Sequence, residues 1–296
     1  MKRLLVTGGA GFLGQHICAK AVADKGIRRV FATYHKNRPI VEGAEYYRLD
    51  LGDADKLQKL IEDLKPDTLI YCAAISAPEE CETQHSLSKA INTTAPFRAA
   101  HICARFGVKF IFTSTDLVFD GLNPPYSEHD PVCPVNHYGR MKAEAEERIL
   151  SVAADALVCR LPLMYGYSFT ATNNFTASVI RTLLQNRPVK LFDDEFRTPA
   201  NVSAIASFLL CADHCRGILH LGGRERVSRY DFGIRIALLF GCDTSLVKPI
   251  SQQQIKTKAA RPQDVSLDSV RAFGVGYSPK LIKDELVEIK KEGHFE

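Results

Sequence analysis

The chain has 296 residues, of which 46% are hydrophobic and 24% are charged, so it can bury a full core as one large domain or as a domain with a smaller lobe. Its net charge of +4 comes from 38 basic and 34 acidic residues scattered along the length. No basic tail or stripe suggests a nucleic-acid partner, whereas small acidic ligands are compatible with this charge.

The first apolar run, residues 4–6, is too short for a signal sequence or a membrane span, so we expect a cytoplasmic protein with no membrane partner. Nine cysteines are an odd number in a protein of this size, and most, including Cys72 and Cys159, fall in predicted strands or helices. We interpret them as reduced core residues. Cys211 and Cys215 have one-turn spacing, but no second ligand pair lies nearby, so no metal is expected.

Short apolar runs alternate with amphipathic segments of helix length from the start of the chain. The predicted strands cover residues 2–7, 29–34, 45–49, 68–73, 109–113 and 156–160. Helices are predicted over residues 53–64, where Asp53 can cap, and over residues 86–106, which Gly107 ends. This alternation predicts an α/β protein with a parallel sheet.

The pattern changes after residue 162. Predicted helices over residues 174–184, 202–211 and 228–240 are there mixed with short strands and prolines. We expect a main domain over residues 1–162, to which strands and helices of residues 189–222 return. A smaller C-terminal lobe is expected over residues 163–188 and 223–296.

A glycine-rich run follows the first predicted strand and opens a helix, with glycines three residues apart. Gly8 permits a tight turn, Gly11 lets the backbone approach a pyrophosphate, and Gly14 allows close helix packing. This context predicts a Rossmann-type, doubly wound sheet whose first turn binds a dinucleotide, with Phe12 and Leu13 also facing it. A glycine-rich turn without a ligand is the alternative.

The residues after the second predicted strand bear on the choice between NAD and NADP. An acidic residue there accepts from the adenosine ribose of NAD, whereas an arginine accommodates the 2′-phosphate of NADP. His35, Lys36 and Arg38 follow this strand, without an acid. NADP(H) is therefore predicted, with NAD as an alternative cofactor and a solvated basic loop as the alternative structure. Asp50 and Leu51 would lie beside the adenine, unless Asp50 only caps a helix.

Tyr138 and Lys142 lie four residues apart at the start of a predicted helix, so their side chains share a face. A free phenol has a pKa of about 10, too high for ready proton exchange at neutral pH, and an adjacent ammonium would lower it. The pair therefore predicts a general acid with its activating cation. An exposed helix pair without a catalytic role is the alternative when the pair is considered alone.

Hydroxyl groups stand at the end of the fifth predicted strand, as Thr113, Ser114 and Thr115. Ligands bind at the carboxyl edge of a parallel sheet. A hydroxyl there can donate to a substrate carbonyl, while Tyr138 gives it a proton and a nicotinamide gives it hydride. The alternative is a hydroxyl-rich turn that caps the sheet.

Together these features resemble the extended short-chain dehydrogenases/reductases over nearly the whole chain. The glycine loop, Cys72-Ala73-Ala74, Asn92, Ser114-Thr115-Asp116 and Tyr138-x-x-x-Lys142 carry this resemblance. Within that superfamily the chain is most similar to the dTDP-4-dehydrorhamnose reductase family. The motifs that carry this second likeness are the Ser-Thr-Asp-Leu-Val-Phe-Asp-Gly segment at residues 114–121, Pro134-x-x-x-Tyr138-Gly139-x-x-Lys142 and Arg261-Pro262-x-x-x-x-Leu267-Asp268.

The resemblance implies that Thr115 is the catalytic hydroxyl, with Ser114 as its rival, and that Tyr138 is the general acid. It also implies that Lys142 lowers the pKa of Tyr138 and holds the nicotinamide ribose. The further cofactor contacts that it implies are Ala73, Ala74, Ser76, Thr113 and Arg160. The substrate contacts that it implies are Ser76, Thr115, Asp116, Tyr138, Asn174, Phe175, Arg197 and Arg261.

Two departures from the family pattern leave the substrate open. Leu117 stands where the family usually has tyrosine, and residues 196–200 stand where it has Gly-x-Pro-Thr. Arg197, within an Arg-Thr-Pro segment, resembles the broader group of sugar-nucleotide epimerases and dehydratases and could pair bidentately with a diphosphate. A helix cap for Asn174 and surface positions for Arg197 and Arg261 are the alternatives.

The resemblance implies an NADPH-dependent reductase of a nucleotide-linked 4-keto sugar, with the C-terminal lobe binding the substrate. A sugar-nucleotide epimerase or dehydratase, which takes hydride and returns it, is one alternative. A non-catalytic NADP-binding regulatory subunit is another, because fold alone does not imply function. The sequence is also compatible with a homo-oligomer.

Overall fold

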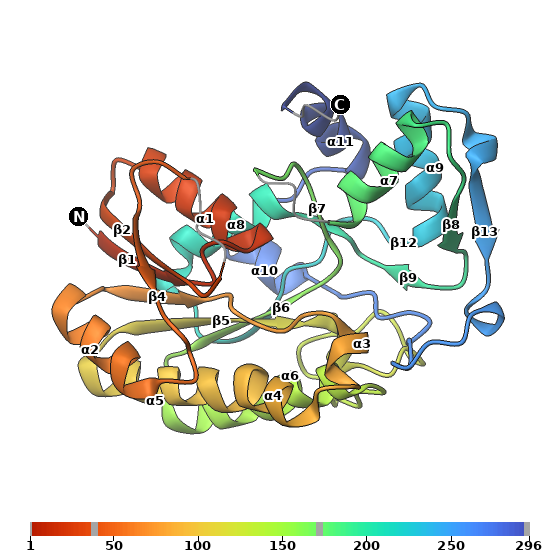
Figure 1. The fold of residues 1–296 in the computed structure, drawn as a ribbon. Coiled ribbons are helices and arrows are strands. Elements are labelled where there is room, and N and C mark those ends of the chain that lie inside the picture. Colours follow the sequence, from red (N-terminus) through yellow and green to blue (C-terminus); the bar gives the residue numbers. More distant parts are fainter. Residues whose placement is uncertain (1, 37–40, 170–173, 293–296) are drawn as a thin grey trace.

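The computed structural model describes residues 2–36, 41–169 and 174–292 (Figure 1). Within these ranges, seven strands form a central sheet in which all neighbouring strands are parallel. In spatial order they are β3 (Glu45–Arg48), β2 (Ile27–Tyr34), β1 (Lys2–Thr7), β4 (Thr68–Tyr71), β5 (Lys109–Thr115), β6 (Leu157–Leu161) and β11 (Gly217–His220). The chain adds strands on one side of β1 and then crosses to the other side. This reversal confirms the predicted Rossmann-type, doubly wound fold.

Helices cover both faces of this sheet (Figure 1). On the first face lie α1 (Phe12–Ala23), α8 (Val202–Cys211) and α10 (Val270–Gly274). On the second face lie α2 (Ala54–Leu64), α5 (Ala95–Phe106) and α6 (His137–Val152), with α3 (Pro78–Cys81) against α6. Successive strand residues point to opposite faces, so Leu4 and Val6 pack beneath α1 while Leu5 packs on the second face. The central strands are mostly apolar because both faces are covered, whereas the edge strand β3 has the sequence Glu-Tyr-Tyr-Arg.

The predicted element ends agree closely with the structure. Asp53 caps α2 by accepting a hydrogen bond from the backbone N of Lys56 at 3.1 Å, and Gly107, at φ +65°, ends α5. β5 is two residues longer than expected, because Ser114 and Thr115 still pair with β6. Thr115 is therefore the last residue of the strand.

One predicted helix is divided in the structure. Residues 86–106, expected as a single helix, form α4 (His85–Lys89), a π-helix (Ala90–Thr94) and α5. Pro96 has no backbone N–H to donate to the carbonyl of Asn92, so regular α-helical bonding cannot continue through this point. Single π-helical turns are frequent at functional sites, and this one carries Asn92.

A second group of elements forms a lobe at one end of the sheet (Figure 1). Its elements are α7 (Phe175–Leu184), α9 (Arg229–Phe240), α11 (Ile282–Glu292), β8 (Val189–Phe192) paired with β13 (Val247–Ile250), and β9 (Phe196–Arg197) paired with β12 (Val227–Ser228). The further short elements are the strand pair β7 (Met164–Tyr165) and β10 (Ala200–Asn201), and 3-10 helices at Asp116–Val118, Ala212–His214, Thr244–Leu246 and Gln252–Gln254. The lobe has its own apolar core, which includes Val179, Phe232 and Leu286.

The expected return of residues 189–222 to the sheet holds for only part of that segment. β8 and β9 pair with strands of the lobe, whereas α8 packs on α1 and β11 becomes the outermost strand of the sheet. The cause is packing: Leu191 of β8 is buried in the core of the lobe. The expected assignment of cofactor and substrate to the two parts stays a prediction.

All nine cysteines are free thiols, but Cys133 and Cys211 are exposed and so differ from the expected core positions. In the described ranges, no group of three or more His, Cys, Asp and Glu side chains is arranged to hold a metal ion. None of the helices described there is both long and apolar enough to cross a membrane.

Candidate active site

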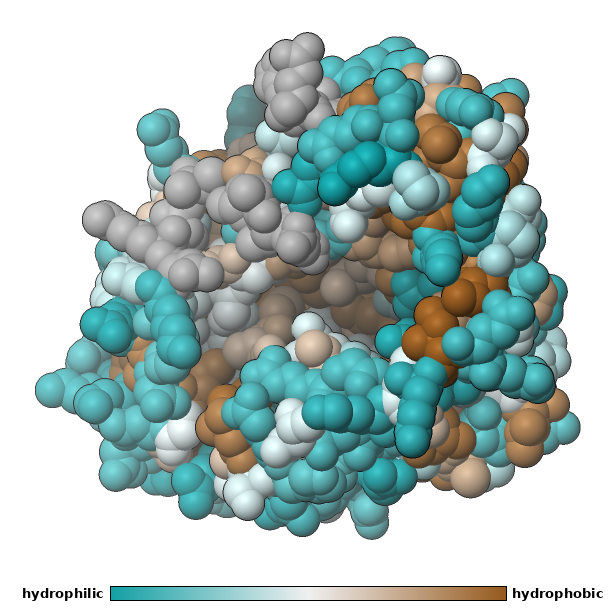
Figure 2. Space-filling view, turned by 45° about the vertical axis from the view of Figure 1, so that its right-hand side comes forward, coloured by the Kyte–Doolittle hydropathy of each residue, from teal (hydrophilic) through white to brown (hydrophobic). Residues whose placement is uncertain are grey.

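A cavity of about 690 Å³ lies between the carboxyl ends of the central strands and the lobe (Figure 2). Residues that follow or end β1, β4, β5 and β6 form one wall, and residues of α7, β8 and β9 form the other. The predicted site residues that line it are Gly8, Gly11, Phe12, Leu13, Ala74, Ser76, Thr113, Thr115, Asp116, Tyr138, Lys142, Asn174, Phe175, Arg197 and Arg261. Folding thus brings most of the predicted site together from both parts of the chain.

The glycine loop has the geometry of a phosphate-binding turn. Gly8 has φ +69°, and a Cβ there would lie 2.9 Å from the backbone N of Ala73. A Cβ on Gly14 would lie 2.2 Å from the carbonyl oxygen of Gly8, so α1 packs directly on the turn. Gly11 caps α1 without a side chain, and the first turn holds no acidic residue. The open amides and positive dipole of this helix end fit the pyrophosphate of a dinucleotide.

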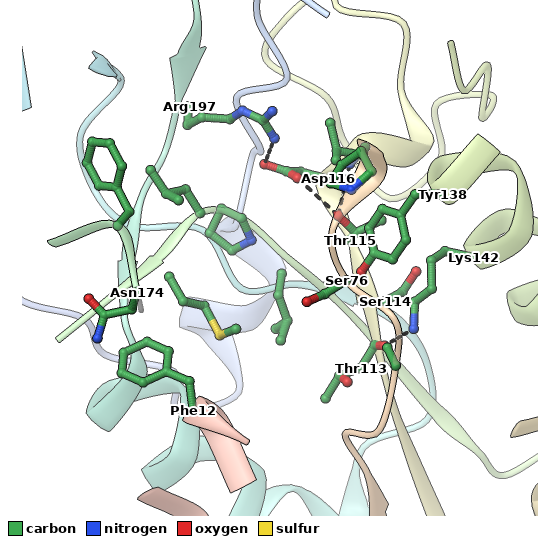
Figure 3. Close-up of a pocket in the computed structure, with 18 of the residues that line it drawn as sticks. Phe12, Ser76, Thr113, Ser114, Thr115, Asp116, Tyr138, Lys142, Asn174 and Arg197 are labelled. Atoms are coloured by element: carbon green, nitrogen blue, oxygen red, sulfur yellow. Dashed lines mark hydrogen bonds and ion pairs between the residues drawn. The ribbon is translucent and has the colours of Figure 1, made fainter. Parts of the chain in front are cut away.

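Close packing brings Tyr138 to Thr115. Asn136 caps α6 by accepting from the backbone N of Gly139 at 2.8 Å. A Cβ on Gly139 would lie 2.1 Å from the carbonyl oxygen of Leu117, so α6 approaches the turn after β5 as closely as a glycine allows. The side chain of Thr115 lies beside that of Tyr138 at the cavity wall (Figure 3).

The two candidate hydroxyls have different partners. Thr115 donates to Oδ1 of Asp116 at 3.2 Å, and its Oγ1 accepts from the backbone N of Leu117 at 3.2 Å. Ser114 donates to the carboxylate of Glu146, which is buried. Since Ser114 is held by this carboxylate while Thr115 contacts Tyr138, the geometry favours Thr115 as the catalytic hydroxyl.

Burial dominates the titration of Tyr138 and Lys142. It raises the pKa of Tyr138, as do Cys81 and Asp116, whereas the neighbouring Thr115 hydroxyl lowers it. Burial lowers the pKa of Lys142 to about 7, although the negative charge of Glu146 raises it. The Lys142 ammonium donates to the carbonyl of Thr113 at 2.6 Å. The predicted lowering of the Tyr138 pKa by Lys142 stays a prediction.

The π-helix positions one edge of the cavity. Asn92 accepts from the backbone N of Ile75 at 2.9 Å and donates to the carbonyl of the same residue at 2.9 Å. These two hydrogen bonds hold the segment whose residues Ala74 and Ser76 line the cavity. Ala73 is not a lining residue and instead lies beneath Gly8.

Arginines gather around a buried carboxylate at the opposite wall. Glu195 is fully buried and pairs with Arg229 at 2.6 Å, Arg197 at 3.3 Å and Arg261 at 3.4 Å. Although burial raises the pKa of Glu195, the three guanidiniums hold it at about 2. Arg197 also reaches across to Asp116, with Nη1 2.7 Å from Oδ2 (Figure 3).

This arginine cluster, defined as Arg197, Arg229 and Arg261, carries excess positive charge. Lys190 also lines the cavity, so four cations face three carboxylates: Glu195, Asp116 and Glu79, whose Oε1 lies 3.9 Å from Nη2 of Arg261. The buried Nε groups of Arg197 and Arg261 have no hydrogen-bond partner in the described part of the chain. The wall is therefore suited to an anion. Sequence reasoning missed Arg229 and Lys190, since neither lies in a motif.

The structure separates several predicted cofactor residues from the cavity. His35, Lys36, Asp50 and Leu51 lie at the ends of β2 and β3 and do not line it. Asp50 accepts from the backbone N of Gly52 at 2.9 Å, which stabilises the turn before α2. Arg38 lies outside the described residues.

Arg160 requires a correction. Its side chain is buried, pairs with Glu146 at 2.8 Å and contacts Nε2 of His220 at 3.2 Å. Strand alternation turns it away from the cavity, and Leu161 and Pro162 line the cavity instead.

Asn174 and Phe175 stabilise the lobe and also line the cavity. Asn174 caps α7 by accepting from the backbone N of Ala177 at 2.8 Å, as the alternative interpretation expected, and it also lines the cavity. Phe175 lines the cavity and stacks on Phe232 of the lobe, with ring centroids 5.9 Å apart. The helix cap thus fixes where α7 begins at the cavity wall.

The fold and site define a class of protein. A doubly wound sheet with a glycine-rich first turn, and a Tyr-Lys helix beside a strand-end threonine, is the arrangement of an oxidoreductase of the extended short-chain dehydrogenase/reductase type. The chain belongs to the family described as RmlD substrate binding domain, whose model matches residues 1–290. The predicted family likeness is therefore confirmed.

Similar proteins match nearly the full chain. The probable low-salt glycan biosynthesis reductase Agl14 of Haloferax volcanii is 31% identical over 292 residues and 96% of each chain. The methionine adenosyltransferase 2 subunit beta of Rattus norvegicus is 28% identical, over 93% of this chain and 83% of that one. A dTDP-4-dehydrorhamnose reductase structure from Clostridium acetobutylicum has a TM-score of 0.85 at 26% identity, over 98% and 99% of the chains. Another, from Bacillus anthracis in complex with NADP, shares the fold with a TM-score of 0.84 at 22% identity, over 99% of each chain.

Proposed function

We propose that this chain is an NADPH-dependent reductase of a nucleotide-linked 4-keto sugar. The observation that carries the proposal is that one cavity holds Thr115, Tyr138 and Lys142 on one wall and the arginine cluster on the other. The first set can reduce a carbonyl, and the second can hold a diphosphate. The reductase names of the Haloferax and Clostridium proteins support this assignment, and so does the NADP in the Bacillus structure.

The side chains of the first wall have distinct tasks. When bound, NADPH supplies the hydride that adds to the carbonyl carbon. Thr115 donates a hydrogen bond to the carbonyl oxygen in exchange for its bond to Asp116. Tyr138, kept protonated because burial raises its pKa, gives its phenolic proton to the same oxygen as the alcohol forms. Lys142, anchored on Thr113 at 2.6 Å, keeps further N–H donors for the ribose of the cofactor.

The arginine cluster supports the nucleotide half of the proposed substrate. A sugar nucleotide carries a diphosphate between its sugar and its nucleoside. Arginine is suited to phosphate because its planar fork donates two parallel hydrogen bonds. The net positive charge of this wall favours the negative charge of such a diphosphate. We infer that the substrate lies with its diphosphate on the cluster and its keto group toward Thr115.

The direct test mixes the purified protein with NADPH and dTDP-4-keto-6-deoxyhexose and follows the absorbance of the reduced cofactor. We expect consumption of NADPH with equimolar formation of the 4-hydroxy sugar nucleotide, and loss of both in Tyr138→Phe. Good binding of NADPH without consumption would contradict the proposal. Turnover of a sugar nucleotide without net oxidation would indicate an epimerase or dehydratase instead.

A regulatory subunit is the second candidate. The observation that favours it is the likeness to methionine adenosyltransferase 2 subunit beta of several vertebrates, at 27–29% identity over about 93% of this chain. Two results together would favour this candidate. A pull-down would recover one enzyme partner in stoichiometric amount, and Tyr138→Phe would support the activity of that partner as well as the wild type does. The position of Tyr138 beside Thr115 in the cavity argues for catalysis, because cofactor binding alone does not require a positioned phenol.

A further inference from the structure

A cation from β3 lies at the end of β2. The two strands are parallel neighbours, with Arg48 opposite Tyr34. Nε of Arg48 donates to the carbonyl of His35, the first residue after β2, at 3.2 Å. His35, Lys36 and Arg48 are all exposed. The sequence pattern indicated cations here only from the loop after β2, whereas the sheet adds one from the neighbouring strand.

Arg48 also lies on the side of the sheet that carries the glycine loop. Residues two apart on a strand share a face, so Arg48 lies on the face of Tyr46. Tyr46 packs against the core beneath α1, and a Cβ on Gly9 would lie 3.6 Å from its ring. The turn itself is attached to β2, because the backbone N of Gly9 donates to the carbonyl of Thr33 at 2.8 Å. The Arg48 guanidinium and the glycine loop therefore border one region beyond the end of β2.

No residue in the described ranges neutralises the charge of Arg48. Among the described residues it forms no ion pair, and its one hydrogen bond uses Nε and leaves Nη1 and Nη2 available. Arg29, at the opposite end of the same two strands, instead pairs with Glu45 at 2.7 Å. The two arginines thus differ in what they can bind: Arg29 is satisfied within the sheet, and Arg48 presents two donors.

We propose that Arg48 binds the 2′-phosphate of NADP(H), together with Lys36, and is the residue that sets the preference for NADP(H) over NAD(H). This inference rests on the NADPH preference in the proposed function. In a Rossmann fold the residues beyond the second strand meet the adenosine ribose, so a phosphate on that ribose lies next to them. The two free Nη groups of Arg48 match the paired oxygens of a phosphate, and Lys36 adds a point charge.

The test measures binding, independently of turnover. Calorimetric titrations use NADPH, NADH, 2′,5′-ADP and 5′-AMP on the wild type, on Arg48→Gln and on the matched control Arg29→Gln. We expect Arg48→Gln to weaken NADPH and 2′,5′-ADP by roughly tenfold to a hundredfold, the range for hydrogen bonds to a charged group, and to leave NADH and 5′-AMP unchanged. Arg29→Gln should bind all four ligands as the wild type does.

Other outcomes separate the possible failures. Equal weakening of NADPH and NADH by Arg48→Gln would overturn the proposal and show that Arg48 only fastens β3 to the loop after β2. If the wild type prefers NADPH and Arg48→Gln keeps the same preference for NADPH over NADH, the role of Arg48 is overturned and the proposed function still stands. A wild type that binds NADH as well as NADPH would overturn the NADPH preference itself, and the proposal with it. If Arg48→Gln does not fold, Arg48→Lys keeps the charge without the fork and should show an intermediate loss for NADPH and 2′,5′-ADP and none for NADH and 5′-AMP.

Discussion

Ser114 and Thr115 are adjacent hydroxyl residues that their partners distinguish. Ser114 also lines the cavity, but its hydroxyl donates to the buried Glu146, which also pairs with Arg160, so this hydroxyl is held in a structural network. Thr115 ends β5, donates to Asp116 and lies beside Tyr138 at the cavity. Neighbouring strand residues point to opposite sides, which explains how two hydroxyls one residue apart acquire different surroundings.

We expect Thr115→Ala to lower kcat/KM for the keto sugar about 100-fold, because the carbonyl oxygen loses its donor in the transition state. Ser114→Ala is the matched control. It should cost about 1 kcal/mol of unfolding free energy and leave kcat/KM near that of the wild type. Steady-state kinetics and urea denaturation measure the two effects. A larger kinetic loss in Ser114→Ala than in Thr115→Ala would reverse the assignment.

Lys142 makes the stability of the protein depend on pH. Burial lowers its pKa from 10.5 in the unfolded chain to about 7, so between these values the unfolded chain binds a proton that the folded chain does not. The free energy of unfolding should therefore rise with pH from about 7 to 10.5. Below this window both states are protonated at Lys142, and above it neither is.

The comparison of the wild type with Lys142→Met isolates this contribution, because methionine fills a similar volume without a titratable group. The wild type should gain stability relative to the variant by up to about 1.4 kcal/mol per pH unit above pH 7. Urea denaturation at several pH values measures the difference. Two curves that stay parallel across this window would show that the Lys142 pKa is not depressed.

At the scale of elements, the junction of β1 and α1 depends on the absence of side chains. The Cβ of an alanine at position 14 would lie 2.2 Å from the carbonyl oxygen of Gly8, so α1 would have to move away from the turn. The helix end that is proposed to meet the pyrophosphate would move with it. Stability and cofactor binding are coupled at this point.

Gly14→Ala should cost about 1–3 kcal/mol of unfolding free energy and weaken NADPH binding as well. Gly274→Ala in α10 is the control, because its Cβ would meet no atom within 4 Å, and it should change neither quantity. Urea denaturation and fluorescence titration with NADPH are the measurements. Normal NADPH affinity in a destabilised Gly14→Ala would show that the helix end does not position the cofactor.

Element types and positions were predictable for much of the sheet part because most strands are short apolar runs and some helix ends carry clear cap residues. Asp53 and Gly107 show how local these signals are. The π-helix was missed, since its cause, Pro96 within a strongly amphipathic segment, leaves the hydrophobic period almost unchanged. The placement of β8 and β9 was also missed, because both can pair only with strands that come much later in the chain.

At the scale of the whole molecule, the two walls of the cavity divide the proposed chemistry. The sheet part contributes Thr115, Tyr138 and Lys142, and the segment around the lobe contributes the arginine cluster. The Asp116–Arg197 ion pair connects the walls. We therefore expect variants of the cluster to affect the nucleotide sugar and not the cofactor.

Arg261→Gln should raise KM for the nucleotide sugar roughly tenfold, because a charged donor to the diphosphate is lost, and leave kcat and the Kd for NADPH nearly unchanged. Arg271→Gln is the control: Arg271 pairs with Glu128 at 3.8 Å and does not line the cavity. Steady-state kinetics with calorimetric NADPH titration measure these quantities. An equal effect of both variants on KM would remove Arg261 from the substrate site.

The sequence by itself determined the α/β class, the glycine turn and the Tyr138–Lys142 pair, because each depends on residues close together along the chain. Only the tertiary structure decided the partners of the charged groups. Arg160 turned to Glu146, Lys142 to the carbonyl of Thr113, and Arg229 joined the cluster. A buried charge must find its counter-charge or acceptor in space, and such a partner can lie anywhere in the sequence.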